Sequence, residues 1–234
     1  MSEDTEHQKT VPPPFFSIGI TTYDRVDMLI DAINSVLDQT FTDYEVIVSN
    51  DNPARTLTSE TIGIHDPRVV FVNQARNLGE FYNMDYLLKA SRGVYFTWLA
   101  DDDYYAPGFL QNVYEALQAN ADAPSCVLTS FKISYGNPPS LHQGEKENIK
   151  RKVLVYSGRR FLRDYWRGRI NVVGTTGFFT KQFLVDSGGF KKMTHLPIAI
   201  FSEYLLIMQI SLLEQVLVID APFICLRVHG GSWS

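Results

Sequence analysis

Short apolar runs alternate with amphipathic stretches along the first hundred residues of the chain. The apolar runs are rich in β-branched and aromatic residues, which predicts buried strands at residues 16–21, 44–49, 68–73 and 94–99. Apolar positions recur at helical spacing in between, which predicts helices over residues 25–37 and about 78–90. Strands that are apolar on both faces and alternate with helices predict an α/β fold, with a mostly parallel sheet covered on both sides.

The second half of the chain is less regular. Residues 134–152 are rich in proline, glycine and charge, so we expect an excursion from the sheet there that is a candidate lid. Beyond it the pattern predicts a helix near 159–166, a glycine-rich segment at 173–179, a buried helix near 201–213 and a strand pair near 216–219 and 223–228. Residues 1–14 end in three prolines and are expected to form a flexible tail, followed by a single domain over 15–234.

Composition narrows the class of protein. The hydrophobic fraction of 45% and the charged fraction of 20% are those of a folded globular chain, and a net charge of −5 predicts no nucleic-acid partner. Cys126 and Cys225 lack a CxxC partner, which argues against a disulfide scaffold or a zinc site. The first ten residues lack the apolar stretch of a signal peptide, so a cytoplasmic location is predicted, with peripheral contact at the inner face of the membrane left open.

Three consecutive aspartates, Asp101, Asp102 and Asp103, follow the fourth predicted strand. Ligands of an open α/β sheet bind beyond the carboxyl ends of its strands, so this is where a functional site is expected. Neighbouring carboxylates repel each other, and a bound Mg²⁺ or Mn²⁺ would offset that repulsion. The alternative is a solvated acidic turn that caps the next helix.

Other polar residues also follow predicted strands. Thr21 and Tyr23 come after the first strand and Asp51 after the second, where a hydroxyl, a ring and a carboxylate could contact a nucleoside; Asp51 could equally form a turn. Glu203 lies inside an apolar helix, where an unpaired carboxylate is costly, so it is expected to face a polar cleft or a structural ion pair. His229 follows the last strand and could bind a metal or a phosphate, or be structural.

Several motifs are missing. The sequence has no GxGxxG after the first strand, no GxxxxGK[ST], no GxSxG and no HExxH. Dehydrogenases, P-loop NTPases, serine hydrolases and zinc proteases are therefore excluded.

Taken together, the segments resemble the family 2 glycosyltransferases of the GT-A fold over about residues 16–234. Those that carry the likeness are residues 17–51, 98–110, 187–190, 202–209 and 226–234, in the family's order. The resemblance implies an inverting, metal-dependent enzyme that moves a sugar from a nucleoside-diphosphate sugar, with uridine the expected base, to a hydroxyl of a carbohydrate or lipid-linked carbohydrate. It also implies a role in surface polysaccharide synthesis, a nucleotide-binding half over about 15–103 and an acceptor-side half over about 104–234.

The resemblance also implies roles for single residues. It implies nucleotide or donor contacts for Thr21, Tyr23, Asp51, Arg76, Asp101 and Asp102, a Mn²⁺ or Mg²⁺ ion on Asp102, Asp103 and His229, and a catalytic base at Glu203. Many relatives have an aspartate at the position of Ala100, so we expect Asp101 to substitute for it.

Two other functions stay open at this point. A sugar nucleotidyltransferase would use similar loops, but it usually has a glycine-rich, basic triphosphate loop near the first strand, which this chain lacks. A catalytically silent nucleotide-sugar or glycan-binding module would bind a donor without turning it over. Trp166 and Trp233 are candidates for stacking on a sugar, or they are ordinary packing aromatics.

Overall fold

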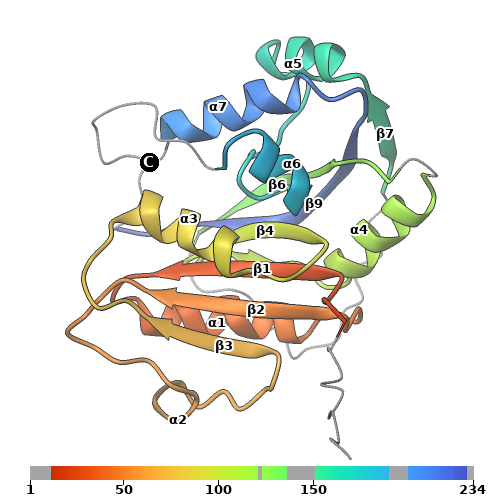
Figure 1. The fold of residues 1–234 in the computed structure, drawn as a ribbon. Coiled ribbons are helices and arrows are strands. Elements are labelled where there is room, and N and C mark those ends of the chain that lie inside the picture. The colour runs from red at the N-terminus through yellow and green to blue at the C-terminus, as the bar shows by residue number, and fades with distance from the viewer. Residues whose placement is uncertain (1–11, 121–122, 136–150, 190–199, 231–234) are drawn as a thin grey trace, which may run out of the picture.

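The computed structural model describes residues 12–120, 123–135, 151–189 and 200–230. Its strands form one nine-stranded sheet in the order β3-β2-β1-β4-β8-β6-β9-β5, with β7 paired to β9 (Figure 1). The strands are β1 (Phe16–Thr22), β2 (Tyr44–Asn50), β3 (Val69–Asn73), β4 (Tyr95–Ala100), β5 (Tyr104–Tyr105), β6 (Cys126–Tyr135), β7 (Val153–Tyr156), β8 (Phe178–Thr180) and β9 (Val216–Val228). The helices are α1 (Val26–Leu37), α2 (Ser59–Ile62), α3 (Glu80–Ala90), α4 (Phe109–Gln118), α5 (Gly158–Trp166), α6 (Lys181–Asp186) and α7 (Ile200–Ile210).

The first four strands form the predicted parallel half of the sheet. β1 pairs in parallel with β2 on one side and β4 on the other, and β2 pairs in parallel with β3. The predicted limits of these strands and of α1 and α3 agree closely with the observed ones. The α/β class is confirmed, and antiparallel β8 makes the complete sheet a mixed one.

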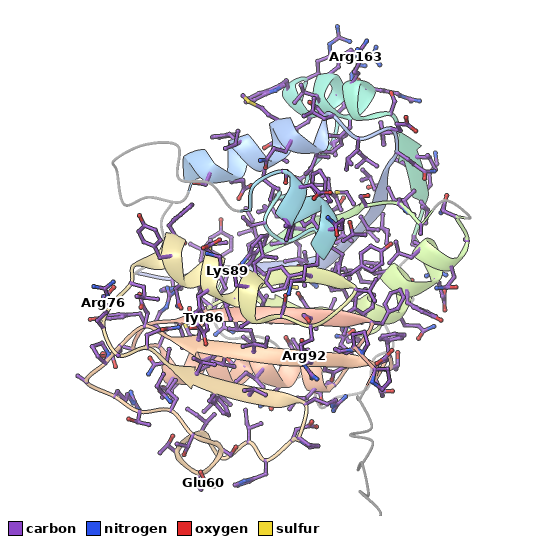
Figure 2. The ribbon with its side chains drawn as sticks, viewed as in Figure 1. Glu60, Arg76, Tyr86, Lys89, Arg92 and Arg163 are labelled. Atoms are coloured by element: carbon purple, nitrogen blue, oxygen red, sulfur yellow. The ribbon has the colours of Figure 1, made fainter. Side chains whose placement is uncertain are left out.

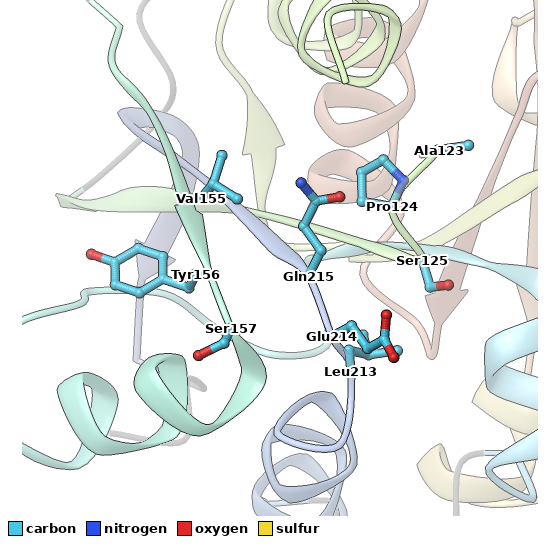
Figure 3. A pocket seen from close by; sticks show the side chains of 9 residues that line it. All are labelled: Ala123, Pro124, Ser125, Val155, Tyr156, Ser157, Leu213, Glu214 and Gln215. Carbon is cyan, nitrogen blue, oxygen red and sulfur yellow. The ribbon is translucent and has the colours of Figure 1, made fainter. Parts of the chain in front are cut away.

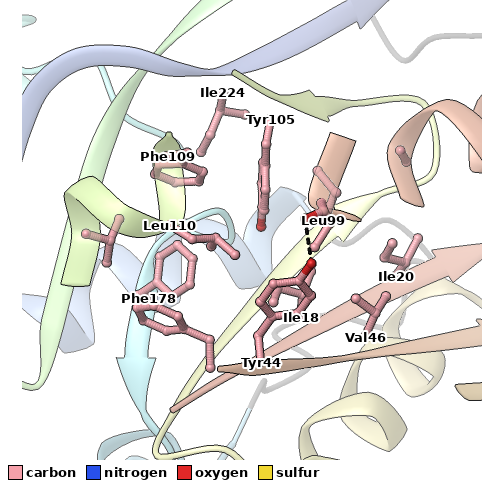
Figure 4. Close-up of a cluster of buried hydrophobic side chains, with 14 of the residues drawn as sticks. Ile18, Ile20, Tyr44, Val46, Leu99, Tyr105, Phe109, Leu110, Phe178 and Ile224 are labelled. Carbon is pink, nitrogen blue, oxygen red and sulfur yellow. Dashed lines mark hydrogen bonds between the residues drawn. The ribbon is translucent and has the colours of Figure 1, made fainter. Parts of the chain in front are cut away.

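Two hydrophobic clusters cover the two faces of the sheet. Alternate residues of each central strand point to opposite faces, so Val46 and Val48 of β2 lie in one cluster and Ile47 lies in the other. Helices α1 and α4 cover the first face, where Phe109 packs beside Phe178 (Figure 4). Helices α3, α5, α6 and α7 cover the second. Strands buried on both faces explain why the runs in the sequence are mostly apolar and do not alternate with polar residues.

Helix α1 also holds the segment that follows β4. The amide of Gln39, just past the helix, donates to the Ala106 carbonyl at 3.0 Å and accepts from the Leu110 N–H at 3.1 Å. The Ser35 hydroxyl accepts from the Tyr105 N–H at 3.0 Å. These buried contacts fix the chain on the far side of the acidic triplet.

A second buried network fixes the chain on the near side of β4. Glu45 of β2 accepts a hydrogen bond from the Ser17 hydroxyl at 2.6 Å and another from the Arg92 N–H at 2.7 Å. The Ser17 hydroxyl accepts in turn from the Gly93 N–H at 2.7 Å. A Cβ on Gly93 would lie 2.6 Å from the Ser17 nitrogen, so only glycine permits this close approach. The turn before β4 is therefore held against β1 and β2.

Strands β9 and β6 in the C-terminal half differ from the sequence prediction. The expected strand pair is one continuous strand, β9, which passes through Pro222. Pro222 lies at a register shift opposite Ser130 of β6, where a bulge tolerates a residue that has no N–H to donate. Ser134 and Tyr135 belong to β6 instead of the predicted excursion, and residues 136–150 of that candidate lid lie outside the described residues.

Two further expectations touch the ends of the chain and the membrane. Most of the predicted tail, residues 1–11, lies outside the described part of the chain. None of the helices that the structure describes combines the length and the apolar character required to span a bilayer.

Candidate functional site

The carboxyl ends of β1, β2 and β4 meet at one edge of the sheet. Thr21 lies opposite Ser49 on one side and Ala100 on the other, and the Asp51 N–H donates to the Thr22 carbonyl at 2.9 Å. The register therefore brings Thr21, Asp51 and the aspartates after β4 to the same edge, where parallel sheets bind their ligands.

Asp101 is the most buried of the three aspartates. Its side chain has no exposed surface, and Arg25 places a guanidinium nitrogen 2.5 Å from one carboxylate oxygen. Burial raises the pKa of Asp101, and the charge of Arg25 opposes that rise. Arg25 is therefore the charge partner that allows a carboxylate at this buried position.

Asp102 lies between two nitrogen groups. One of its oxygens is 3.0 Å from a guanidinium nitrogen of Arg25 and 3.1 Å from Nε2 of His229. His229 follows β9, at the far end of the sequence from Arg25. The fold thus brings the loop after β1 and the residues after β9 together around the Asp102 carboxylate.

Asp103 faces β9. Its carboxylate accepts the Arg227 N–H at 3.0 Å, beside the buried Arg227 side chain, which forms an ion pair with Asp31 at 3.0 Å. Burial, reinforced by the charge of Asp102, raises the pKa of Asp103 to about 7.

These contacts test the predicted cation site. Asp102 and His229 supply an oxygen and a nitrogen ligand at one point, a set that Mn²⁺ and Mg²⁺ accept when phosphate oxygens and water complete the shell. Asp103 is engaged by Arg227 instead. Within the described residues, no group of three or more histidine, cysteine, aspartate or glutamate side chains could hold a metal. The chain thus fits a cation that takes most of its ligands from a bound diphosphate, with two from the protein.

The predicted nucleoside contacts line the same edge. Asp51 accepts the N–H groups of Leu78 and Gly79 at 2.7 and 2.9 Å, and so caps the start of α3. Each carboxylate oxygen has a second lone pair for a ligand. Tyr23 is 52% exposed on the loop after β1, and Arg76 is exposed on the loop after β3 (Figure 2).

Glu203 lies in the first turn of α7 and faces a glycine-containing loop. One of its oxygens accepts the Gly174 N–H at 3.0 Å, and the other accepts the Thr175 hydroxyl at 3.2 Å. The Trp98 N–H donates to the Thr175 carbonyl at 3.4 Å, which fixes this loop against the carboxyl half of β4. Burial raises the pKa of Glu203, and the hydrogen bonds from Gly174 and Thr175 oppose the rise. The sequence predicted that Glu203 faces either a polar cleft or an ion-pair partner. Among the described residues its carboxylate accepts hydrogen bonds from Gly174 and Thr175 and has no ion-pair partner.

Two residues of this edge were absent from the sequence prediction. Arg25 pairs with Asp102 across 77 positions of sequence and also pairs with Asp101, and Arg227 fixes Asp103. The only available signal was charge: an arginine soon after the first strand is a natural partner for three aspartates after the fourth.

A pocket of about 580 Å³ lies at the opposite edge of the sheet (Figure 3). It is lined by Ala123, Pro124, Ser125, Val155, Tyr156, Ser157, Leu213, Glu214 and Gln215, at the amino ends of β6 and β9. No predicted site residue lines it.

Known proteins share this sequence pattern and this fold. The family model for Glycosyl transferase family 2 matches residues 17–184. An uncharacterised glycosyltransferase of Rickettsia bellii is 32% identical over 136 residues, 58% of this chain and 20% of the relative. One of Rickettsia typhi is 31% identical over 152 residues, 62% of this chain and 47% of the relative. The chain thus spans less than half of either relative.

Two solved structures have a similar fold. S. aureus TarS 1–349 in complex with UDP-GlcNAc gives a TM-score of 0.68 at 17% identity, over 93% of this chain and 59% of that one. The same protein in complex with UDP gives 0.69 at 17% identity, over 91% and 60%. At this level of identity the likeness concerns the fold, and it extends over nearly the whole chain.

Proposed function

The chain belongs to glycosyl transferase family 2, and from that premise we propose that it transfers a sugar from a nucleoside-diphosphate sugar to a hydroxyl group of an acceptor. Its sheet and helices have the GT-A arrangement that the family resemblance implies. The observation that carries the proposal is that β4 connects the two parts of the site. The aspartates follow its carboxyl end, and the loop that holds Glu203 is hydrogen-bonded to Trp98 within it.

In this proposal, residues 15–103 bind the donor. The exposed ring of Tyr23 stacks on the base. The Thr21 hydroxyl donates or accepts a hydrogen bond, and the free lone pairs of Asp51 accept hydrogen bonds from the nucleoside. Arg76 contacts the diphosphate, and Asp101, whose side chain is fully buried, acts on the donor through Arg25, which it holds beside the site. Uridine is the proposed base, because TarS, with a similar fold, binds UDP and UDP-GlcNAc.

Asp102 and His229 would hold a Mn²⁺ or Mg²⁺ ion beside the diphosphate. When bound, such an ion supplies positive charge that stabilises the leaving diphosphate. In this structure, the guanidinium of Arg25 places a positive charge beside the Asp102 carboxylate. Arg25 is therefore placed to shift from Asp102 to a diphosphate oxygen, since a guanidinium binds carboxylate and phosphate with the same geometry.

Glu203 is the proposed catalytic base. As the acceptor oxygen attacks the anomeric carbon and the bond from that carbon to the diphosphate breaks, Glu203 takes the proton of the acceptor hydroxyl. Attack on the face opposite to the leaving group inverts the anomeric centre. Gly174 and Thr175 orient the carboxylate, and its raised pKa makes it a stronger base than an exposed glutamate. We propose residues 104–234 as the half that binds the acceptor, a carbohydrate or lipid-linked carbohydrate of surface polysaccharide synthesis.

Thermal unfolding with nucleoside diphosphates tests the donor site. A ligand at 100 times its Kd adds about 2.7 kcal/mol, so UDP with Mn²⁺ should raise the midpoint by about 5–10 °C. Asp102→Ala should lose the part of this rise that depends on Mn²⁺. A rise that is equal in both proteins would contradict the role of Asp102.

The proposed base is tested by separating binding from turnover. Glu203→Gln keeps the shape of the side chain and should bind UDP as the wild type does, while release of UDP from UDP-sugars should fall by about 10²–10⁴-fold. Glu60→Gln makes the same chemical change at an exposed glutamate of α2 and is the matched control, which should retain the activity (Figure 2). If the wild type binds UDP but turns over no UDP-sugar with any carbohydrate acceptor, the silent binding module would replace the enzyme.

A further inference from the structure

Positive charge is concentrated in helix α5 and the three residues that follow it. Residues 158–169 contain five arginines and one aspartate, a local net charge of +4 in a protein of net charge −5. Arg159, Arg163 and Arg167 recur at intervals of four residues, so they project from one side of the helix, and all three are exposed. Figure 2 shows Arg163 on the outer side of α5.

An exposed apolar stripe lies next to this basic surface. Tyr204, Met208 and Leu212 follow one another at intervals of four residues along α7 and its continuation, and they are 37, 46 and 83% exposed. Trp166, which is 57% exposed, stacks on Tyr204 with ring centroids 5.8 Å apart. Large apolar side chains that line up on a surface mark a site of interaction.

The two helices form one continuous surface. At one end the Gly158 N–H donates to the Leu213 carbonyl at 3.0 Å, and at the other Trp166 stacks on Tyr204. The helices therefore lie antiparallel and side by side, with α5 on the outside of the molecule (Figure 1). We name the surface formed by Arg159, Arg163, Trp166, Arg167, Tyr204, Met208 and Leu212 the α5–α7 face.

We propose that the α5–α7 face binds an anionic membrane surface. Arginines carry long side chains that reach lipid phosphates, tryptophan and tyrosine favour the headgroup region, and methionine and leucine enter the apolar boundary below it. Asp164, the acidic residue of α5, is nearly buried and lies 3.3 to 3.7 Å from nitrogen atoms of Arg160 and Arg163. It therefore leaves Arg159 and Arg167 without an ion pair among the described residues.

An anionic membrane and the acidic remainder of a second copy both complement the charge of the arginines, and the apolar stripe favours the membrane. Residues outside 158–169 carry a net charge of −9, but the apolar stripe beside the arginines matches the layered chemistry of a bilayer, with phosphate above hydrocarbon. The proposal does not depend on the transfer activity, because it concerns lipid binding alone.

Vesicle sedimentation tests the proposal. The protein should bind vesicles of phosphatidylglycerol mixed with phosphatidylcholine, bind vesicles of phosphatidylcholine alone much less, and dissociate from the anionic vesicles as salt is added. Each arginine at an anionic surface contributes about fivefold, so R159Q/R167Q should bind roughly 25-fold more weakly. Equal binding to both lipids, or no binding to either, would overturn the proposal.

A matched variant separates this surface from charge in general. R55Q/K89Q removes two exposed cations elsewhere, including Lys89 on α3, and should bind the anionic vesicles like the wild type (Figure 2). M208S/L212S keeps all charges and should also bind more weakly, because serine does not enter the apolar layer. If R55Q/K89Q loses as much binding as R159Q/R167Q, the interaction is nonspecific and the face has no special role.

The oligomeric state tests whether a second copy of the chain binds the α5–α7 face instead of a membrane. Sedimentation equilibrium of the wild type and M208S/L212S should show the same monomeric mass. A wild-type dimer that M208S/L212S dissociates, together with no vesicle binding, would make the face an interface between copies and refute the membrane assignment. Circular dichroism of each variant confirms that it is folded.

Discussion

Arg25 illustrates which residues a single sequence reveals and which it hides. The aspartates at 101–103 could be found because they are consecutive and follow an apolar strand, whose end marks a binding edge. Arg25 pairs with Asp101 and Asp102 although it lies far from them in the sequence, and only its charge and its position soon after β1 indicate this role. Glu203 could be found because a carboxylate in an apolar helix requires a partner, but its partners, Gly174 and Thr175, depend on how a loop folds.

The protonation of Asp103 should make stability depend on pH. Its pKa is about 7 in the folded protein and about 3.9 in an unfolded chain, so between those values the folded state retains a proton that the unfolded state has released. The stability that the protonated Asp103 contributes to the folded state is fully present below pH 4 and is lost as the pH rises to 7. Asp103→Asn removes the ionisation, so its free energy of unfolding relative to the wild type should increase over this range, by on the order of 2–4 kcal/mol.

Urea unfolding at a series of pH values measures this difference. Asp43→Asn, which alters an exposed aspartate on the loop before β2, controls for the change in net charge and should follow the wild type. A constant difference between Asp103→Asn and the wild type from pH 4 to 8 would show that Asp103 titrates normally.

At the scale of elements, the parallel strands could be predicted and the C-terminal strands only in part. β1, β2 and β4 are buried on both faces, so large apolar side chains occupy neighbouring positions along them, with few polar residues between. β6 ends in Phe131–Tyr135, where apolar and polar side chains alternate and three of the five residues are exposed, so no buried apolar run marks this end of the strand. The sequence predicts two strands, one on either side of Pro222, and proline is uncommon inside a strand. The bulge opposite Ser130 shows why β9 continues through this residue.

The contact between α5 and α7 depends on Gly158. A Cβ at this position would lie 2.4 Å from the Ser211 carbonyl oxygen and 2.6 Å from that of Leu213, so the helices would have to separate. Gly158→Ala should therefore reduce the free energy of unfolding by about 1–3 kcal/mol in urea titrations. Gly230→Ala, where a Cβ would meet no atom within 4 Å, is the control and should cost little. Equal stability of the two variants would show that α5 does not pack closely on α7.

For the whole molecule, the short strand β8 joins the two halves of the sheet. It pairs with β4 on one side and with β6 on the other, and its neighbouring residues Phe178 and Phe179 enter different hydrophobic clusters. Neither the position of β8 in the sheet nor its antiparallel direction could be predicted from a segment of three residues. The mixed sheet is thus a property of the complete fold.

Because β8 joins the halves, the described fold should unfold as one cooperative unit. Phe178 is fully buried, and its ring centroid lies 4.8 Å from that of Phe16. Phe178→Ala should reduce the free energy of unfolding by about 3–5 kcal/mol. The midpoints from tryptophan fluorescence, which includes Trp98 in the opposite cluster, and from far-UV circular dichroism should fall together. Separate midpoints for the two signals would mean that the halves unfold independently.

Strand β9 pairs with β5, β6 and β7 and then brings Arg227 and His229 to the aspartates. A ribosome makes this strand after the other eight, so the nascent chain can assemble its parallel half while Asp102 still lacks the imidazole beside it. Until β9 emerges, the acidic segment has Arg25 as its counter-ion and β6 has an open edge. The last strand to be synthesised thus closes that edge and completes the acidic cluster in one step, so the site forms only once the rest of the sheet has been made.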